Sequence, residues 1–413
     1  MKSTICKKVI YIVDYPLGTR DAERFGLAKL QLAGLQVSVW DLSHFLLPAA
    51  SKLEIKSPSW VDLTVCLEIG HFRDLCSSLT SEDIVILIGG LGVGQAWRGR
   101  KILRLICATP ARLASISTGN VPTPIHRDSL RWLFATRAKK VYSSLTHLSW
   151  WKRVPELFAS HMLSSALAAQ QKMRIPGAIR SLDHIWAGVA VSGTASYLVA
   201  PSTTVTYIHE FDYDLVLALR ATDRKSSPRV VFIDSKSQLH PDIAIHGTSV
   251  GMPIEVYSHI VCRALDEIEK RLENQVVIAV HPRAAPGVME PWYGGRTLIY
   301  GQTSELIADA TAVIVAESST AIGLAAIFQR PLVLLSSNRS DLYIRGMNRA
   351  FAEALDTQLI DLDAPDLPHF TMDINEQAYE RYVQKYIKRQ GTPAEPFWSV
   401  VAYEIISGTR NPI

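Results

Sequence analysis

Residues 311–335 read TAVIVAESSTAIGLAAIFQRPLVLL. Two aliphatic runs within them, Val313–Ala316 and Leu332–Leu335, have the length and the continuous apolar character of strands buried on both faces of a parallel sheet. Between them, Ser319–Phe328 is rich in small and apolar residues, which favours a helix packed closely on that sheet. The stretch therefore predicts a strand–helix–strand unit, and its connection should be right-handed.

The same alternation extends through the second half of the chain. Pro253–Glu273 carries apolar residues at helical spacing, with the proline near its first turn. Three further strands are predicted at Val230–Ile233, Val276–Val280 and Thr297–Tyr300. One further helix is predicted at Ser304–Ala310. Strands and helices that alternate in this way are typical of a parallel sheet, in which ligands bind at the carboxyl ends of the strands.

The first half of the chain repeats the pattern. A helix is predicted at Asp21–Ala33, followed by Gly34 as its C-terminal breaker. Strands are predicted at Val9–Val13, Val37–Trp40, Ile84–Ile88 and Ile185–Val191. A length of 413 residues is also what two domains require. We therefore expect an α/β protein of two Rossmann-like lobes with a central cleft.

The domain boundaries follow from a polar stretch that ends in proline. Asp223–Pro228 has the composition of a linker, so we expect a first lobe at residues 1–222 and a second lobe at residues 229–390. Residues 391–413 contain a last helical stretch, which we expect to pack back on the first lobe.

Charge and cysteine content exclude several classes of protein. The net charge of +4 is spread along the chain and forms no basic stripe of the kind that binds nucleic acid. The five cysteines are odd in number and lack metal-ligand spacing, which favours buried thiols in a reducing compartment. We therefore predict no zinc site and no disulfide framework.

Hydropathy predicts a cytoplasmic protein. No segment approaches the ~20 apolar residues of a membrane-spanning helix. The apolar run Val9–Val13 is too short for the core of a signal peptide. The basic residues Lys385, Lys388 and Arg389 form either a solvated helix face or a contact with an anionic membrane surface or a phosphate-bearing acceptor.

The first candidate site residue is His281. It follows the apolar strand Val276–Val280 and precedes Pro282 and Arg283, so the strand delivers it to the carboxyl edge of the sheet. A histidine there can donate a hydrogen bond to a departing phosphate or protonate it as a general acid. The alternative is a histidine that only caps the end of its own strand.

The second candidate is the polar run that follows strand Val313–Ala316. Glu317, Ser318, Ser319 and Thr320 precede a small-residue helix. Hydroxyl groups beside the backbone N–H groups of a helix N-terminus can bind an anion. One hydroxyl is enough for ordinary N-capping, and capping is the alternative interpretation.

His281-Pro282 followed by Ser318-Ser319 resembles the His-Pro and Ser-Ser motifs of bacterial sialyltransferases and the related Kdo transferases. The wider chain also resembles a group of bacterial surface-polysaccharide biosynthesis proteins. The stretches that carry this second resemblance are Asp21–Gly26, Val39–Leu42, Phe211–Asp214, His281–Arg283, Gly295-Arg296 and Thr303–Leu306. The resemblance implies a GT-B-like glycosyltransferase that uses a CMP-linked acidic sugar, with an acceptor-side first lobe and a nucleotide-sugar-binding second lobe.

The resemblance also implies roles for the residues. His281 is the catalytic candidate that contacts the donor phosphate. The donor-binding candidates are Arg283, Ser318, Ser319, Thr320, Glu317 and Arg296. Of these, Arg296 is proposed for the carboxylate of the sugar itself, because a guanidinium binds a carboxylate in a two-pronged geometry. The implied partners are a nucleotide-sugar donor and a glycan or lipid-linked glycan acceptor, such as a surface polysaccharide or lipopolysaccharide.

The catalytic carboxylate is less defined. The acidic-acidic-glycine motif of those sialyltransferases is absent from this sequence. A carboxylate is needed as the base that deprotonates the acceptor or as a nucleophile. We place Asp212 and Asp214 first, because in an extended segment they would share one face. Helix capping is their alternative role, and Glu210, Asp14 and Asp234 are the other candidates.

Other functions remain open at this point. Gly89–Gly94 lacks the lysine of a phosphate-binding P-loop and is more typical of a flexible turn. We predict neither a metal nor another cofactor, since the two-lobed pattern differs from that of metal-dependent transferases. The rivals are a transferase with a UDP-, GDP- or CDP-linked donor, a sugar-nucleotide epimerase, and a non-catalytic partner in a polysaccharide assembly complex.

Overall fold

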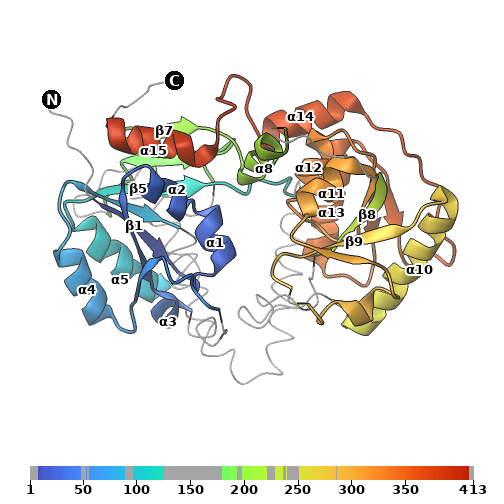
Figure 1. Cartoon of the computed structure of the whole chain (residues 1–413), viewed down its shortest axis with the longest axis horizontal. Helices are drawn as coiled ribbons and strands as arrows, with labels where there is room; N and C mark the ends of the chain where they lie inside the picture. The colour runs from blue at the N-terminus through green and yellow to red at the C-terminus, as the bar shows by residue number, and fades with distance from the viewer. Residues whose placement is uncertain are drawn as a thin grey trace. The chain divides into compact units, whose positions relative to one another are not determined.

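A computed structural model of the chain describes residues 8–47, 53, 55–88, 96–124, 179–192, 198–220, 228–235, 239, 251–284 and 286–408 (Figure 1). The chain divides into two compact units. The first comprises Met1–Thr118, Arg137–Phe211 and Thr392–Ile413, and the second comprises Gly119–Thr136 and Asp212–Gly391. Each unit is built on one parallel sheet.

The first unit contains a seven-stranded sheet in the order β3-β2-β1-β4-β5-β6-β7. The strands are β1 (Lys8–Val13), β2 (Gln36–Asp41), β3 (Asp62–Val65), β4 (Asp83–Leu87), β5 (Arg112–Ser117), β6 (His184–Ala187) and β7 (Thr204–Tyr207). All neighbouring pairs are parallel. The order reverses between β1 and β4, which is the arrangement of a doubly wound sheet.

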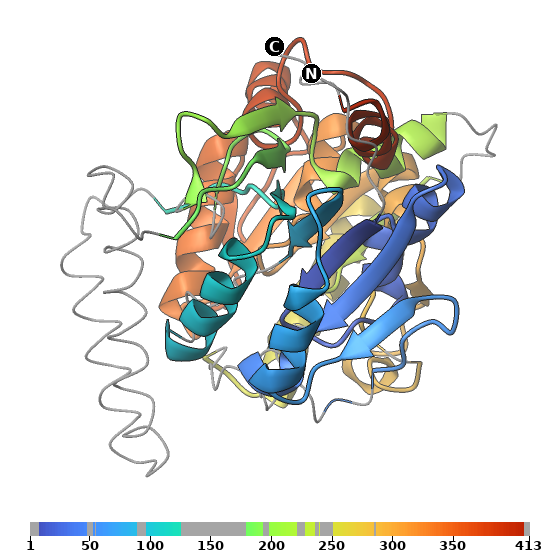
Figure 2. The same ribbon diagram turned by 90° about the vertical axis from the view of Figure 1, so that its left-hand side faces the viewer.

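Helices cover both faces of this sheet (Figure 2). The helices described are α1 (Thr19–Arg24), α2 (Leu27–Leu32), α3 (Ser43–Leu46), α4 (Ile69–Ser77), α5 (Ala96–Cys107) and α15 (Phe397–Ser407). Side chains of α2 and α15 form one apolar core with β1 and β2, and side chains of α4 and α5 form another on the opposite face. Helix α15, the last one that the structure describes, lies beside α2 and belongs to the first unit.

The helix predicted at Asp21–Ala33 is divided into α1 and α2. Gly26 separates them with a left-handed backbone, φ 63°. The ring of Trp398, on α15, occupies the space beside it, and a β-carbon at position 26 would lie 2.2 Å from that ring. The indole Nε1 of Trp398 also donates to the carbonyl of Arg24 over 2.8 Å. A contact from a distant helix therefore explains why one predicted helix becomes two.

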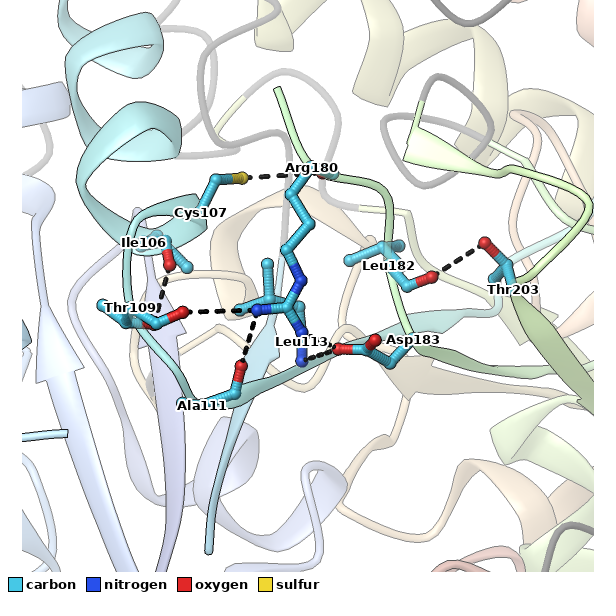
Figure 3. A network of polar contacts seen from close by, with 9 residues as sticks. All are labelled: Ile106, Cys107, Thr109, Ala111, Leu113, Arg180, Leu182, Asp183 and Thr203. Carbon is cyan, nitrogen blue, oxygen red and sulfur yellow. Dashed lines mark hydrogen bonds and ion pairs between the residues drawn. The ribbon is translucent and has the colours of Figure 1, made fainter. Parts of the chain in front are cut away.

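A polar network fastens the start of β6 to the loop before β5 (Figure 3). The guanidinium of Arg180 donates to the carbonyls of Thr109 and Ala111, at 3.3 and 3.1 Å, and to the carboxylate of Asp183. The same carboxylate accepts from the backbone N–H of Leu113 over 2.8 Å. One arginine thus holds together two chain segments that are far apart in sequence.

The second unit contains a six-stranded parallel sheet in the order β10-β9-β8-β11-β12-β13. The strands are β8 (Arg229–Ile233), β9 (Val276–Val280), β10 (Leu298–Tyr300), β11 (Ala310–Val315), β12 (Leu332–Ser336) and β13 (Leu359–Asp361). The helices described are α8 (Phe211–Arg220), α10 (Ile254–Leu272), α11 (Thr303–Asp309), α12 (Ile322–Ile327), α13 (Leu342–Leu355) and α14 (Glu376–Tyr386).

These helices also bury both faces of their sheet. The apolar side chains of α10 pack on one face, and those of α8, α11, α12, α13 and α14 pack on the other. The two parallel sheets, each covered by helices, confirm the predicted α/β fold with two Rossmann-like lobes. The predicted first domain, residues 1–222, extends further than the first unit, because Tyr213 and Val216 of α8 belong to the core of the second unit. Most of the predicted linker, residues 223–228, lies outside the described residues.

Candidate functional site at the carboxyl edge of the second sheet

The order of the second sheet reverses at β8. The chain passes from β8 to β9 on one side and later returns to place β11 on the other side. In doubly wound sheets, ligands bind outside the carboxyl ends of the strands at such a reversal. His281 follows β9, Asp234-Ser235 follows β8, and Glu317-Ser318 comes one residue after the end of β11. The topology therefore brings these residues to adjacent strand ends.

His281 begins a tight turn at the end of β9. Its backbone N–H donates to the carboxylate of Asp234 over 3.2 Å, and its ring Nδ1 accepts from the backbone N–H of Arg283, also over 3.2 Å. Because Nδ1 is an acceptor, the neutral ring carries its proton on Nε2. The turn therefore presents His281 as a hydrogen-bond donor through Nε2, which suits an anionic oxygen better than a proton that must be removed.

The polar run after β11 forms a turn and is only partly a helix cap. Helix α12 begins at Ile322, not at Ser319 as predicted, so Ser318 and Ser319 lie before it and are half-buried. The hydroxyl of Ser319 accepts a long hydrogen bond, 3.3 Å, from the backbone N–H of Ala321. Thr320 is exposed. The predicted helix N-terminus is therefore a loop with hydroxyl groups between strand and helix.

Two buried carboxylates lie beneath these turns. Asp234 is 3% exposed and Glu317 is 2% exposed. The hydroxyl of Ser235 donates to Glu317 over 3.0 Å and so joins the ends of β8 and β11. Tyr257, on α10, interacts electrostatically with both acids. Burial first, and then the charges of Glu317 and Asp234, raise the pKa of its hydroxyl well above the ordinary value. The floor of the candidate site is thus polar and acidic.

Asn348, on α13, holds two of the strand ends in place. Its amide donates to the carbonyl of Ala316, immediately before Glu317, over 3.1 Å and to the carbonyl of Leu335 at the end of β12 over 3.2 Å. The side chain is buried. Sequence reasoning missed this residue because nothing in the local pattern of α13 distinguishes a buried asparagine from a solvated one.

Replacing Asn348 with alanine should lower the free energy of unfolding of the second unit by about 1–2 kcal/mol, because two buried carbonyl groups lose their donor. Urea denaturation of purified variants measures the change. The exposed Asn338, replaced by alanine, is the matched control and should change stability by less than about 0.5 kcal/mol. Equal effects of the two substitutions would show that the amide contributes nothing specific.

Arg296 does not join this group. Its guanidinium donates to Glu269 of α10 over 3.2 and 2.7 Å and also bonds Asp266 of the same helix. Burial opposes the charge, but these two acids outweigh it and raise the pKa of Arg296. The guanidinium therefore connects the start of β10 to α10. The sequence alone cannot reveal a pairing with a helix so far away along the chain.

Asp212 and Asp214 are placed differently from the prediction. They lie in the first turn of α8 and not in an extended segment, so they point to different sides of the helix. Both belong to the second unit, whereas the prediction attached them to the first. Acidic residues in a first helical turn favour the helix dipole, which is their capping interpretation.

The remaining candidate carboxylates have distinct surroundings. Glu210 follows β7 and is buried, with its carboxylate against Gly188 at the end of β6, where a β-carbon would lie 2.1 Å from Oε1. Asp14 follows β1 and is half-buried. Asp234 is occupied by the turn of His281, as described above. Glu210 is thus a buried acid at the carboxyl edge of the first sheet.

Three further predictions concern loops, metals and membranes. The loop Gly89–Gly94 lies outside the described residues. Among the residues that the structure does describe, no three acidic, histidine or cysteine side chains are grouped so that they would hold a metal ion. No helix in the described ranges is both long and apolar enough to cross a bilayer.

The basic residues near the end of the second unit are partly used in packing. The ammonium group of Lys388 lies 5.9 Å from the ring centre of Tyr213, and that of Lys385 lies 5.2 Å from the ring of Tyr386. Burial lowers the pKa of Lys388. The contact of Lys388 with Tyr213 connects the segment just after α14 with α8, whereas the contact of Lys385 lies within α14. Lys385 and Arg389 remain exposed.

Comparison with known proteins gives distant similarities. No family model matches the chain, and no curated protein matches it. Spinosyn forosaminyltransferase SpnP is 14% identical over 97% of this chain and 94% of its own, with a TM-score of 0.42. MurG of Acinetobacter baumannii is 12% identical over 98% and 100%, with a TM-score of 0.40.

A UDP-GlcNAc 2-epimerase of Neisseria meningitidis is 13% identical over 97% of this chain and 100% of its own, with a TM-score of 0.41. The similar structures thus include transferases and an epimerase, and all these TM-scores lie below 0.5. The similarities therefore assign no activity, and the fold is defined by the two sheets themselves.

Proposed function

We propose that the chain is a glycosyltransferase that transfers a sugar from a nucleotide-activated donor to a glycan acceptor, with the donor held by the second unit. The observation that carries this proposal is the convergence of His281 and the Ser318-Ser319 turn at strand ends on either side of β8. A nucleotide leaving group is an anion. Hydrogen-bond donors such as a histidine ring and serine hydroxyls, placed where the strand order reverses, are suited to bind it.

The chemistry assigns a task to each group. The bond between the anomeric carbon and the phosphate oxygen breaks, and the acceptor hydroxyl oxygen forms the new bond to that carbon. Negative charge develops on the departing phosphate, where the Nε2–H group of His281 and the hydroxyls of Ser318 and Ser319 stabilise it. Arg283, half-buried in the same turn, adds positive charge. The acceptor proton passes to a carboxylate base.

The resemblance of the His-Pro and Ser-Ser motifs favours a CMP-linked acidic sugar, such as Kdo or a sialic-acid-like sugar, and a surface polysaccharide or lipopolysaccharide acceptor. One support for the acidic sugar is removed, because Arg296 binds Glu269 and Asp266. Donors linked to UDP, GDP or CDP use the same phosphate chemistry. The nucleotide itself is therefore the property to measure first.

Binding should appear as thermal stabilisation by one nucleotide among CMP, CDP, UMP, UDP and GDP, since a ligand at about 100 times its Kd stabilises the folded state by about 2.7 kcal/mol. His281→Ala should lower the affinity for that nucleotide by roughly 10- to 100-fold, because about one charge-assisted hydrogen bond is lost. Differential scanning fluorimetry and calorimetric titration measure both quantities.

The matched control is His259→Ala, an exposed histidine on α10, which should leave the affinity unchanged. Preference for CMP would support the acidic-sugar donor, and preference for UDP or GDP would replace it. Stabilisation by none of the nucleotides would refute the transferase and favour a non-catalytic role. Conversion of a UDP-sugar without any acceptor would favour an epimerase.

A further inference from the structure

A buried tyrosine is connected to His281 through one carboxylate. Tyr293 lies in the connection between β9 and β10, and its hydroxyl donates to Oδ1 of Asp234 over 2.8 Å. The other oxygen of that carboxylate, Oδ2, accepts from the backbone N–H of His281 over 3.2 Å. The backbone N–H of Asp234 also donates to the carbonyl of Ala279 over 3.0 Å. Three chain segments thus meet at one side chain.

Both side chains of this connection are buried. Tyr293 is 1% exposed and Asp234 is 3% exposed, and a buried carboxylate is tolerated when its oxygens accept hydrogen bonds. Burial first, and then the nearby Tyr257 and Asp234, raise the pKa of the Tyr293 hydroxyl well above its ordinary value. The hydroxyl therefore stays protonated and acts toward Asp234 as a donor.

The local chain is shaped to bring Tyr293 to this position. The two residues that follow, Gly294 and Gly295, have positive φ angles of 61° and 77°, which residues other than glycine rarely adopt. The ring of Tyr293 packs on Phe232 of β8, with 5.7 Å between ring centres. The tyrosine is thus inserted beneath the His281 turn by the bend of the loop and by contact with the strand next to it.

The His281 turn is held from two sides as a result. Asp234 fixes the backbone nitrogen of His281, and the backbone N–H of Arg283 fixes the ring nitrogen Nδ1. If the carboxylate were released from Tyr293, the backbone of His281 would gain freedom and the ring could lose its contact with Arg283. The tautomer with the proton on Nε2 would then no longer be enforced.

We propose that Tyr293 is a positioning residue that, through Asp234, fixes the orientation and the Nε2–H tautomer of His281 for the phosphate of the nucleotide. This inference rests on the proposed function for the identity of the ligand. The geometry of His281, however, can be measured without any ligand. Tyr293 touches neither donor nor acceptor in this scheme and acts only through its neighbours.

The test compares Tyr293→Phe with Tyr379→Phe. Tyr379 is equally buried in the same unit, and its hydroxyl donates to the carbonyl of Arg330 over 3.2 Å, outside the site. Each substitution thus removes one buried hydroxyl and one hydrogen bond. Long-range ¹H–¹⁵N correlation spectra of ¹⁵N-histidine-labelled protein report the tautomer of each of the 12 histidines, and His281→Gln identifies the signal of His281.

In Tyr293→Phe, the Nε2–H signature of His281 should give way to a mixture of tautomers, while Tyr379→Phe should keep the wild-type signature. The affinity for the phosphate-bearing probes CMP and UDP should fall about 10-fold in Tyr293→Phe alone, a change of about 1.4 kcal/mol. Affinity for cytidine and uridine, which lack the phosphate, should not change.

A wild-type signature for His281 in Tyr293→Phe would overturn the proposal, and so would equal losses of affinity in the two variants. Asp234→Asn gives a second measurement if Tyr293→Phe is poorly folded, because asparagine keeps the shape but cannot accept from both donors at once. Failure of wild-type protein to bind any nucleotide would refute the proposed function. The spectra would still decide whether Tyr293 controls His281.

Discussion

Replacement of Trp398 with alanine is expected to lower the free energy of unfolding of the first unit by roughly 3–5 kcal/mol, the usual loss for a large buried aromatic side chain. Trp398 is 1% exposed and packs with Tyr11 of β1 and Phe397, at 6.1 and 5.3 Å between ring centres. Its indole also donates to the carbonyl of Arg24. Urea denaturation followed by circular dichroism measures the loss.

The matched control lies on the same helix. Tyr403 is 63% exposed on the outer side of α15, and Tyr403→Ala should change stability by less than about 0.5 kcal/mol. A comparable loss in both variants would mean that α15 is sensitive to any substitution. A small loss in Trp398→Ala would mean that α15 contributes little to the core of the first unit.

Gly26 and Trp398 illustrate what the sequence could and could not predict of the fold. Aliphatic runs such as Val9–Val13 and Val276–Val280 predicted strands, and the structure confirms them as β1 and β9. A strand buried on both faces needs apolar side chains at every position, so its signal is local. The break at Gly26 is caused by a ring 372 positions later in the chain (398 − 26), and no local pattern contains that contact.

The candidate site also contains residues that the sequence could predict and residues that it could not. His281 directly follows a predicted strand and Ser318 lies two residues after another, and the carboxyl end of a strand is fixed once the strand is known. Arg296 pairs with a separate helix, and Asp212 lies in a helix where an extended segment was predicted, so both are placed differently from the prediction. Tyr293 lies in a connection without regular spacing, so neither periodicity nor a motif marks it. Residues that support a site from beneath are therefore the hardest to predict.

The second large effect is expected at Glu404, on the inner side of α15. This glutamate is buried, and its carboxylate accepts from the indole of Trp186 over 2.8 Å and from the hydroxyl of Thr206 over 3.1 Å. The ring of His184 lies 3.2 Å away. Burial raises the pKa of Glu404, but the bonds from these three residues outweigh it and hold the pKa below the ordinary value.

Glu404→Gln should therefore destabilise the first unit by about 3 kcal/mol near neutral pH, because buried donors lose a charged acceptor. A folded-state pKa below the unfolded value means that this contribution is complete above about pH 4.3 and is lost as the pH falls through the lower, folded-state pKa. The difference between wild type and variant should thus be constant at higher pH and shrink in acid.

Urea denaturation at a series of pH values measures this difference directly, and subtraction removes the contributions of groups that do not interact with Glu404. The exposed Glu23, replaced by glutamine, is the matched control in the same unit and should give a small difference at every pH. A penalty for Glu404→Gln that persisted unchanged in acid would mean that the shape of the side chain stabilises α15, and not its charge. A penalty that shrinks in acid would make Glu404 a charged anchor of α15 on β6 and β7.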